Sequence, residues 1–79
     1  MDDWLTAARD ALAREAGVEP ASLGPSDSDV VELLELARVA AHESGDRRNA
    51  PLLSYLVGLA AGSGVPVERL AAAVRRSTS

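Results

Sequence analysis

The sequence contains no cysteine and no lysine, and only two of its 79 residues are aromatic. Without cysteine the chain can form no disulfide bond and offers no thiolate ligand to a metal, so neither kind of cross-link stabilises its fold. A single histidine and scattered carboxylates give no recognisable metal-ligand spacing, and the calcium-loop pattern is absent. We therefore expect no metal site and no cofactor.

Basic residues and long apolar runs are also scarce. The formal net charge of −4 argues against a nucleic-acid or anionic-membrane binder, because phosphate binding relies on a basic surface. The most apolar run, residues 50–62, is shorter than the ~20 residues that span a bilayer. The acidic N-terminus lacks the basic-then-apolar pattern of a signal peptide. These features predict a soluble, cytoplasmic protein.

The charge that is present is unevenly distributed. Residues 1–45 carry ten acids and three arginines, a net charge of −7, whereas residues 46–79 carry two acids and five arginines, a net charge of +3. This asymmetry favours packing of helices against one another, or the orientation of two subunits. A chain of this length buries only roughly 60% of its unfolded surface, so it gains much from a partner.

Cap residues and apolar spacing predict four helices, and nothing alternates with the period of a strand. The predicted helices run from Asp2 or Asp3 to Gly17, from about Ser28 or Asp29 to Ser44, from Asn49 to Gly62, and from Pro66 onward. Prolines and a glycine make residues 18–27 a connector, with a short extra helical turn around 21–23. We expect an all-α, compact four-helix bundle-like domain over residues 1–76, with a frayed tail at 77–79.

The third helix carries almost no polar residue, and a helix that is apolar all round is expected to be buried all round. We therefore predict that it is the most buried element, with Trp4 and Tyr55 as core anchors. If its short, alanine-rich neighbours fail to cover it, one face is left as an interface. The candidate interface residues are Trp4, Tyr55, Val57, Gly58 and Ala61, the last two because small residues permit close helix approach.

His42 is the only histidine and has two interpretations. As a general base it would act with Asp46, and with Ser54 or Tyr55 as a more distant partner. As a structural residue it lies near a helix C-terminus, where it interacts with free carbonyls and the helix dipole. A thin core leaves little room for a pocket and an oxyanion hole. We expect no catalytic residues and no enzymatic activity, and the role of His42 stays open.

The sequence contains two further candidate binding sites, one for an anion and one for DNA, and each also has an ordinary structural interpretation. Arg47 and Arg48 precede the third helix, where a helix N-terminus favours an anion, but arginines in a turn are usually solvated or ion-paired.

Residues 12–23 resemble the first half of a helix-turn-helix. The second helix of that motif would be short, broken by Gly24 and Pro25, and without side chains that read bases.

Three segments of the sequence together resemble a known family: "MDDWL", "LLELARVAAH" and "APLLSYLVGLAAG". They are similar to small, uncharacterised actinobacterial helical domains that occur alone, or beside or fused to molybdenum cofactor guanylyltransferase. The resemblance covers about residues 1–74 and implies an accessory module for molybdenum cofactor (guanine dinucleotide) assembly. His42 and the Ala50-Pro51-Leu52 helix start fall on the family pattern, which assigns them no role.

The function we predict is a non-catalytic protein-interaction module that forms a homodimer or docks on a larger protein, such as a nucleotidyltransferase. The alternative is an anion- or nucleotide-binding regulatory domain that uses Arg47 and Arg48. A helix-turn-helix-like DNA binder is a third hypothesis, which the acidic charge disfavours.

Overall fold

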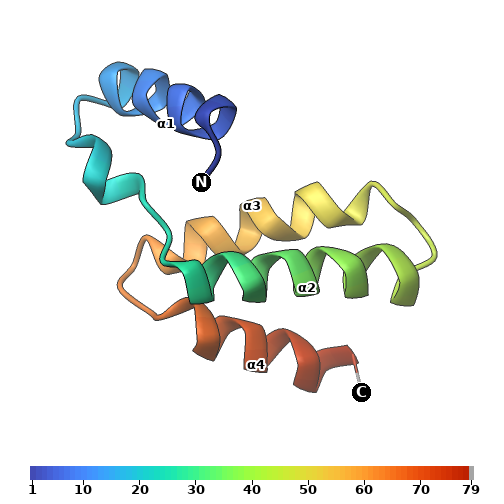
Figure 1. Ribbon diagram of the computed structural model, residues 1–79. Helices are drawn as coiled ribbons and strands as arrows, with labels where there is room; N and C mark the ends of the chain where they lie inside the picture. The colour runs from blue at the N-terminus through green and yellow to red at the C-terminus, as the bar shows by residue number, and fades with distance from the viewer. Residues whose placement is uncertain (79) are drawn as a thin grey trace.

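The computed structural model describes residues 1–78, and over that range it is all-α, with no strand. The elements are α1 (Asp3–Ala16), the 3-10 helix η1 (Pro20–Leu23), α2 (Asp27–Glu43), α3 (Asn49–Ala61) and α4 (Val67–Thr78) (Figure 1). The predicted four-helix, all-α fold is confirmed, and η1 is the short helical turn expected in the connector. None of these helices combines the length and the hydropathy that crossing a membrane requires.

Local capping chemistry defines the ends of α1. The Asp2 carboxylate accepts a hydrogen bond of 2.7 Å from the backbone N–H of Leu5, which satisfies one of the free donors of the first turn. At the other end, Gly17 adopts the left-handed conformation, with φ of 70°. Glycine takes this conformation without a Cβ penalty, so the helix ends where the sequence predicts.

A reciprocal capping box starts α2. The Ser26 hydroxyl accepts from the backbone N–H of Asp29 at 3.1 Å, and the Asp29 carboxylate accepts from the backbone N–H of Ser26 at 3.3 Å. The helix therefore begins at Asp27, slightly earlier than predicted, because Ser26 rather than Ser28 or Asp29 is the capping residue.

The ends of α3 follow the sequence, whereas α4 extends further than predicted. Pro51 lies in the first turn of α3, where its missing N–H has no acceptor to lose. The helix α4 extends through Thr78, so residues 77 and 78 of the expected frayed tail are helical; residue 79 lies outside the described residues. Arg75 on α4 pairs with Glu32 on α2 at 2.9 Å and ties the two helices together.

The three helices α2, α3 and α4 pack on one another around a small core. Each contributes one buried residue to it: Leu36, Val57 and Ala71. Partly buried leucines and a valine surround these three: Leu33, Leu53, Leu70 and Val74. Leu36 is the largest fully buried side chain of the described residues. The core is therefore thin even for a chain of this length.

The helix α1 stands apart from this body (Figure 1). Among the described elements, its Cα atoms come within 8 Å of η1 alone, and Ala13 is its one buried residue. The separation makes the molecule open: the radius of gyration is 13.2 Å, against about 11.6 Å expected for a compact domain of this length.

Candidate functional site

The helix α3 has two apolar faces. One face packs into the core through Val57 and Leu53. The other face is exposed and consists of Leu52, Tyr55, Leu56 and Leu59, each between 58% and 61% accessible. Their spacing of i, i+3, i+4 and i+7 places all four on one stripe of the helix. We call these four residues the outer face of α3.

This exposure corrects two predictions. The helix α3 is not buried all round, because α1 does not pack against it and the two helices that do, α2 and α4, cover only its inner side. Trp4 and Tyr55 are not core anchors, since their side chains are 77% and 58% exposed.

The structure also separates the five candidate interface residues. Trp4 and Tyr55 lie at the surface, but Val57 is only 4% exposed and belongs to the core. Gly58 faces open space, since an added Cβ would meet nothing within 4 Å, so no other helix of the single chain approaches it closely. Ala61 is half-buried. The three leucines of the outer face were missed, although their helical spacing was readable.

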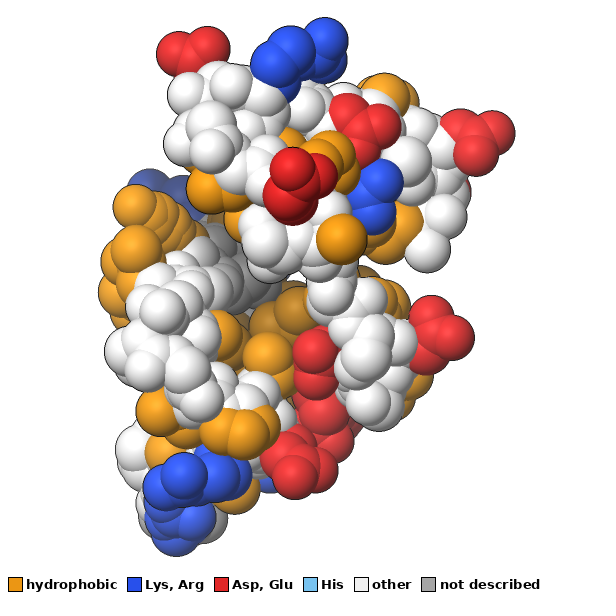
Figure 2. Space-filling model, turned by 90° about the vertical axis from the view of Figure 1, so that its left-hand side faces the viewer, with side chains coloured by type: hydrophobic (Ala, Val, Ile, Leu, Met, Phe, Trp, Pro, Cys, Tyr) orange, Lys and Arg blue, Asp and Glu red, His pale blue; other side chains and the backbone are white. Residues whose placement is uncertain are grey.

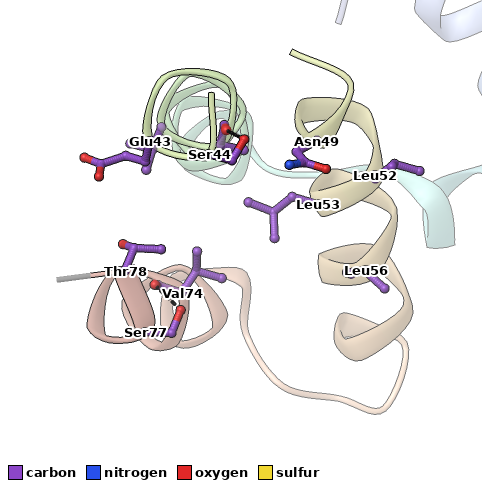
Figure 3. Close-up of a pocket in the computed structure, with 11 residues that line it drawn as sticks. Glu43, Ser44, Asn49, Leu52, Leu53, Leu56, Val74, Ser77 and Thr78 are labelled. Atoms are coloured by element: carbon purple, nitrogen blue, oxygen red, sulfur yellow. Dashed lines mark hydrogen bonds between the residues drawn. The ribbon is translucent and has the colours of Figure 1, made fainter. Parts of the chain in front are cut away.

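An apolar groove adjoins the outer face. It has a volume of about 490 Å³ and lies where the C-terminal ends of α2 and α4 meet the start of α3. In Figure 3, Leu53 points into the space between the three helices and Val74 faces it from α4. The lining residues are Val39, Ala40, Glu43, Ser44, Asn49, Leu52, Leu53, Leu56, Val74, Ser77 and Thr78. Leu52 and Leu56 belong to both surfaces, so groove and outer face are continuous.

The helix α1 presents a second unpartnered apolar surface. Trp4, Leu5 and Leu12 are all exposed and lie within about 100° of one another around the helix. Ala13, which is buried, lies on the side opposite Trp4. We call Trp4, Leu5 and Leu12 the apolar stripe of α1.

A hollow lies between the connector and the three-helix body, and Figure 2 shows hydrophobic side chains at the surface around the hollowed side of the molecule. Its volume is about 360 Å³. The connector lines it with Leu23, Gly24 and Pro25, and the helices line it with Leu33, Val57 and Ala61, among others. The α1 part therefore meets the body mainly through the connector.

The candidate anion site at the start of α3 already holds an anion from the chain. The Asp46 carboxylate accepts from the Arg48 guanidinium at 2.8 Å and from the Arg48 backbone N–H at 2.9 Å. The guanidinium, and then that N–H, hold the pKa of Asp46 below its usual value, and the carboxylate raises the pKa of Arg48 in turn. Arg47 is exposed beside this pair.

The residues of the catalytic hypothesis are each engaged or placed elsewhere. His42 lies exposed in the last turn of α2, and Asp46 is held by Arg48. The Ser54 hydroxyl donates to the carbonyl of Ala50, within its own helix, at 3.0 Å. Tyr55 lies on the outer face of α3. Among the residues of this hypothesis, therefore, none is a free nucleophile or a free carboxylate that would act together with His42.

The helix-turn-helix resemblance also finds no support in the geometry. The element that would be the recognition helix is η1, a 3-10 helix of four residues. A recognition helix must be long enough to lie in the major groove and carry side chains that reach base edges. Residues 20–23 meet neither requirement.

A comparison with family models matches a domain of unknown function, DUF6457, to residues 1–79. The chain belongs to the DUF6457 family. The match covers the apolar stripe of α1, the outer face of α3 and the groove alike, so all three surfaces lie inside the DUF6457 domain. No curated protein and no solved structure matches the chain.

Proposed function

We propose that this domain is a non-catalytic, cytoplasmic protein-interaction module whose docking surface is the outer face of α3 together with the adjoining groove. The observation that carries the proposal is the exposure of Leu52, Tyr55, Leu56 and Leu59 on one continuous stripe. A contiguous apolar patch on a small protein typically marks an interface. Polar residues, including Asn49 and Ser77, also line the groove, and known interfaces likewise combine apolar with polar groups.

The total surface area supports this function independently. A compact monomer of this mass is expected to expose about 4,500 Å², whereas the chain exposes 5849 Å². The excess, about 1,300 Å², is larger than the roughly 800 Å² that each partner contributes to a standard interface. The chain therefore has enough uncovered surface for a specific partner.

Anion binding has less support as an alternative. The Asp46 carboxylate takes the backbone N–H of Arg48 and its guanidinium, which are two of the donors that a phosphate could use at this helix start. A phosphate would have to displace a carboxylate that is covalently part of the same turn.

A photocrosslinking amino acid placed at Leu59 tests the proposed function in the cell. We expect it to crosslink to protein, whereas the same group at Leu34, a leucine on α2 that is slightly more exposed than Leu59, gives little product. Equal crosslinking from both positions, or none from Leu59, would contradict the proposal.

We further propose, from the sequence resemblance, that the module is actinobacterial and assists molybdenum cofactor guanylyltransferase. The purified domain would then bind that transferase in solution, as measured by calorimetry or co-sedimentation. Loss of guanine dinucleotide cofactor on deletion of the gene is the matching result in the cell. If the transferase does not bind the domain and deletion of the gene leaves cofactor levels unchanged, this assignment is wrong. The proposal of an interaction module would still stand.

A further inference from the structure

Resting on the proposed function, we infer that the partner of the outer face of α3 is α1 of a second copy of this chain. The two helices would exchange reciprocally across a dimer, so that each copy gives its apolar stripe and receives that of the other. Trp4 would enter the groove at the start of α3.

The two surfaces match in length. From Trp4 to Leu12 the stripe of α1 covers about 12 Å, and from Leu52 to Leu59 the outer face of α3 covers about 10 Å, at a rise of 1.5 Å per residue. Both are apolar and exposed in the single chain. An amphipathic helix that lays its apolar stripe against such a surface is a common recognition mode.

Charge sets the direction of the pairing. Residues 1–16 carry four acids and two arginines, a net charge of −2, whereas residues 46–79 have a net charge of +3. Asp2 and Asp3 lie at the start of α1, and Arg47 lies just before α3. A parallel arrangement brings these opposite charges together and puts Trp4 beside the groove, which opens at the same end of α3. An antiparallel arrangement would place Trp4 near Leu59, away from the groove.

The groove suits a tryptophan. Leu53, Leu56 and Val74 supply an apolar lining, and Ser44 and Asn49 are polar residues of the same lining. Tryptophan buries a large apolar area, and its indole N–H needs an acceptor when buried. An aromatic anchor in a pocket ringed by polar groups is typical of the residues that dominate binding energy.

A second copy fits better than closure of α1 onto its own α3. Ala13 is buried where α1 packs on η1, on the side of the helix opposite Trp4. Docking on another copy leaves this packing in place. Docking on the same chain requires α1 to leave η1 or the connector to rearrange.

Sedimentation velocity over a range of concentrations, on wild type and on two surface variants, tests the inference. We expect the wild type to dimerise, and the emission of Trp4, the only tryptophan, to shift to shorter wavelength with the dimer. Trp4→Ser and Leu56→Glu are each expected to weaken the dimer by about thirtyfold or more, the effect of losing a central anchor. Val31→Glu, at an exposed position of α2, is the matched control and should dimerise as the wild type does.

Mixing the two weakened variants gives the decisive result. The Leu56→Glu chain retains an intact α1, and the Trp4→Ser chain retains an intact α3, so one of the two contacts is restored in a mixed dimer. We expect the mixture to associate more strongly than either variant alone. Circular dichroism checks that each variant keeps its helices, since both residues are exposed in the single chain.

Other outcomes overturn the inference. If Trp4→Ser dimerises normally while Leu56→Glu does not, the outer face of α3 is an interface but α1 is not its partner, and the proposed function survives. If the wild type stays monomeric with short-wavelength emission, α1 closes onto its own chain. If it stays monomeric with exposed Trp4, the second copy is not the partner, and the crosslinks at Leu59 then decide the proposed function separately.

Discussion

At the residue scale, Asp46 pairs with Arg48 in the basic turn before α3. The carboxylate lies two residues before Arg48 and accepts from its side chain and backbone together. Because the pair is exposed to solvent, its energetic contribution is small. Its role is to satisfy a free N–H at the start of α3 and to neutralise one of two neighbouring arginines.

Acidification should weaken this turn, and the sign follows from the lowered pKa of Asp46. A carboxyl group with a folded-state pKa below its unfolded value contributes stability above the unfolded pKa and loses it as the pH falls through the folded pKa. In Asp46→Asn the amide oxygen can still accept from Arg48, but the charge is gone. We expect the variant to melt slightly below the wild type at pH 7, and the gap to close below about pH 4. Thermal melts across this range measure it; a constant gap would contradict the assignment.

At the element scale, α1 is held to the rest of the chain by little more than η1 and the connector. Its apolar stripe has no partner within the chain, and its one buried residue is an alanine. A helix of this length is marginal in water without tertiary packing. Its stability should therefore depend on what covers the stripe.

Hydrogen exchange at two protein concentrations tests this dependence. At low concentration we expect the amides of α1 to exchange much faster than those in the middle of α2 and α3, because α1 opens locally at little cost. At high concentration, amides of α1 should slow markedly, since the dimer covers its stripe. Uniform exchange rates across the four helices, independent of concentration, would show that α1 is a stable part of the monomer.

Local sequence signals predict the elements well, and tertiary packing explains where they fail. Asp2, Gly17 and Pro51 lie where capping chemistry places them, so the helices and the short turn of the connector were readable. The burial of α3 could not be predicted in this way. The spacing of apolar residues shows which faces of a helix are apolar, but it does not show how many neighbouring helices cover them. Leu36 lies in the core while Leu34, about 200° away around the same helix, is exposed, and which of these two faces is buried depends on how α2 packs on α3 and α4.

The sequence predicts the kind of candidate site, but of the four residues of the outer face it predicts only Tyr55. A leftover face on the third helix was anticipated from its composition, whereas the position of that face follows from which side packs on α2 and α4. Val57 was assigned to the interface and lies in the core. The groove depends on three helix ends meeting in space, and no spacing within one segment encodes it.

At the scale of the whole molecule, the surface is large and the core small. Four residues of the described chain are buried apolar core residues, and only Leu36 among them is larger than valine. A domain of this length has a small net stability in any case. Covering the exposed apolar surface therefore changes stability substantially.

Because the core is small, shortening one of its side chains should lower the free energy of unfolding substantially. Leu36→Ala removes the largest fully buried side chain and is expected to lower the free energy of unfolding by about 2–5 kcal/mol. Leu34→Ala, on the exposed side of the same helix, should stay within about 0.5 kcal/mol of the wild type. Urea unfolding followed by circular dichroism measures both, and equal effects would place the core elsewhere.

The melting temperature should also rise with protein concentration, because association stabilises only the folded chains that form the dimer. Leu56→Glu should shift this dependence to much higher protein concentrations, and Val31→Glu should preserve it. A melting temperature that is the same at every concentration would argue against self-association.

The central claim is that the outer face of α3 is covered by protein in the cell, and the absence of cysteine allows a direct measurement. A single thiol introduced by Leu59→Cys, or by Leu34→Cys as a control of similar exposure, is labelled in intact cells with a permeable maleimide, and each rate is normalised to that of the unfolded chain. We predict that the thiol at position 59 reacts several times more slowly than the thiol at position 34. Equal normalised rates at the two positions would contradict the claim.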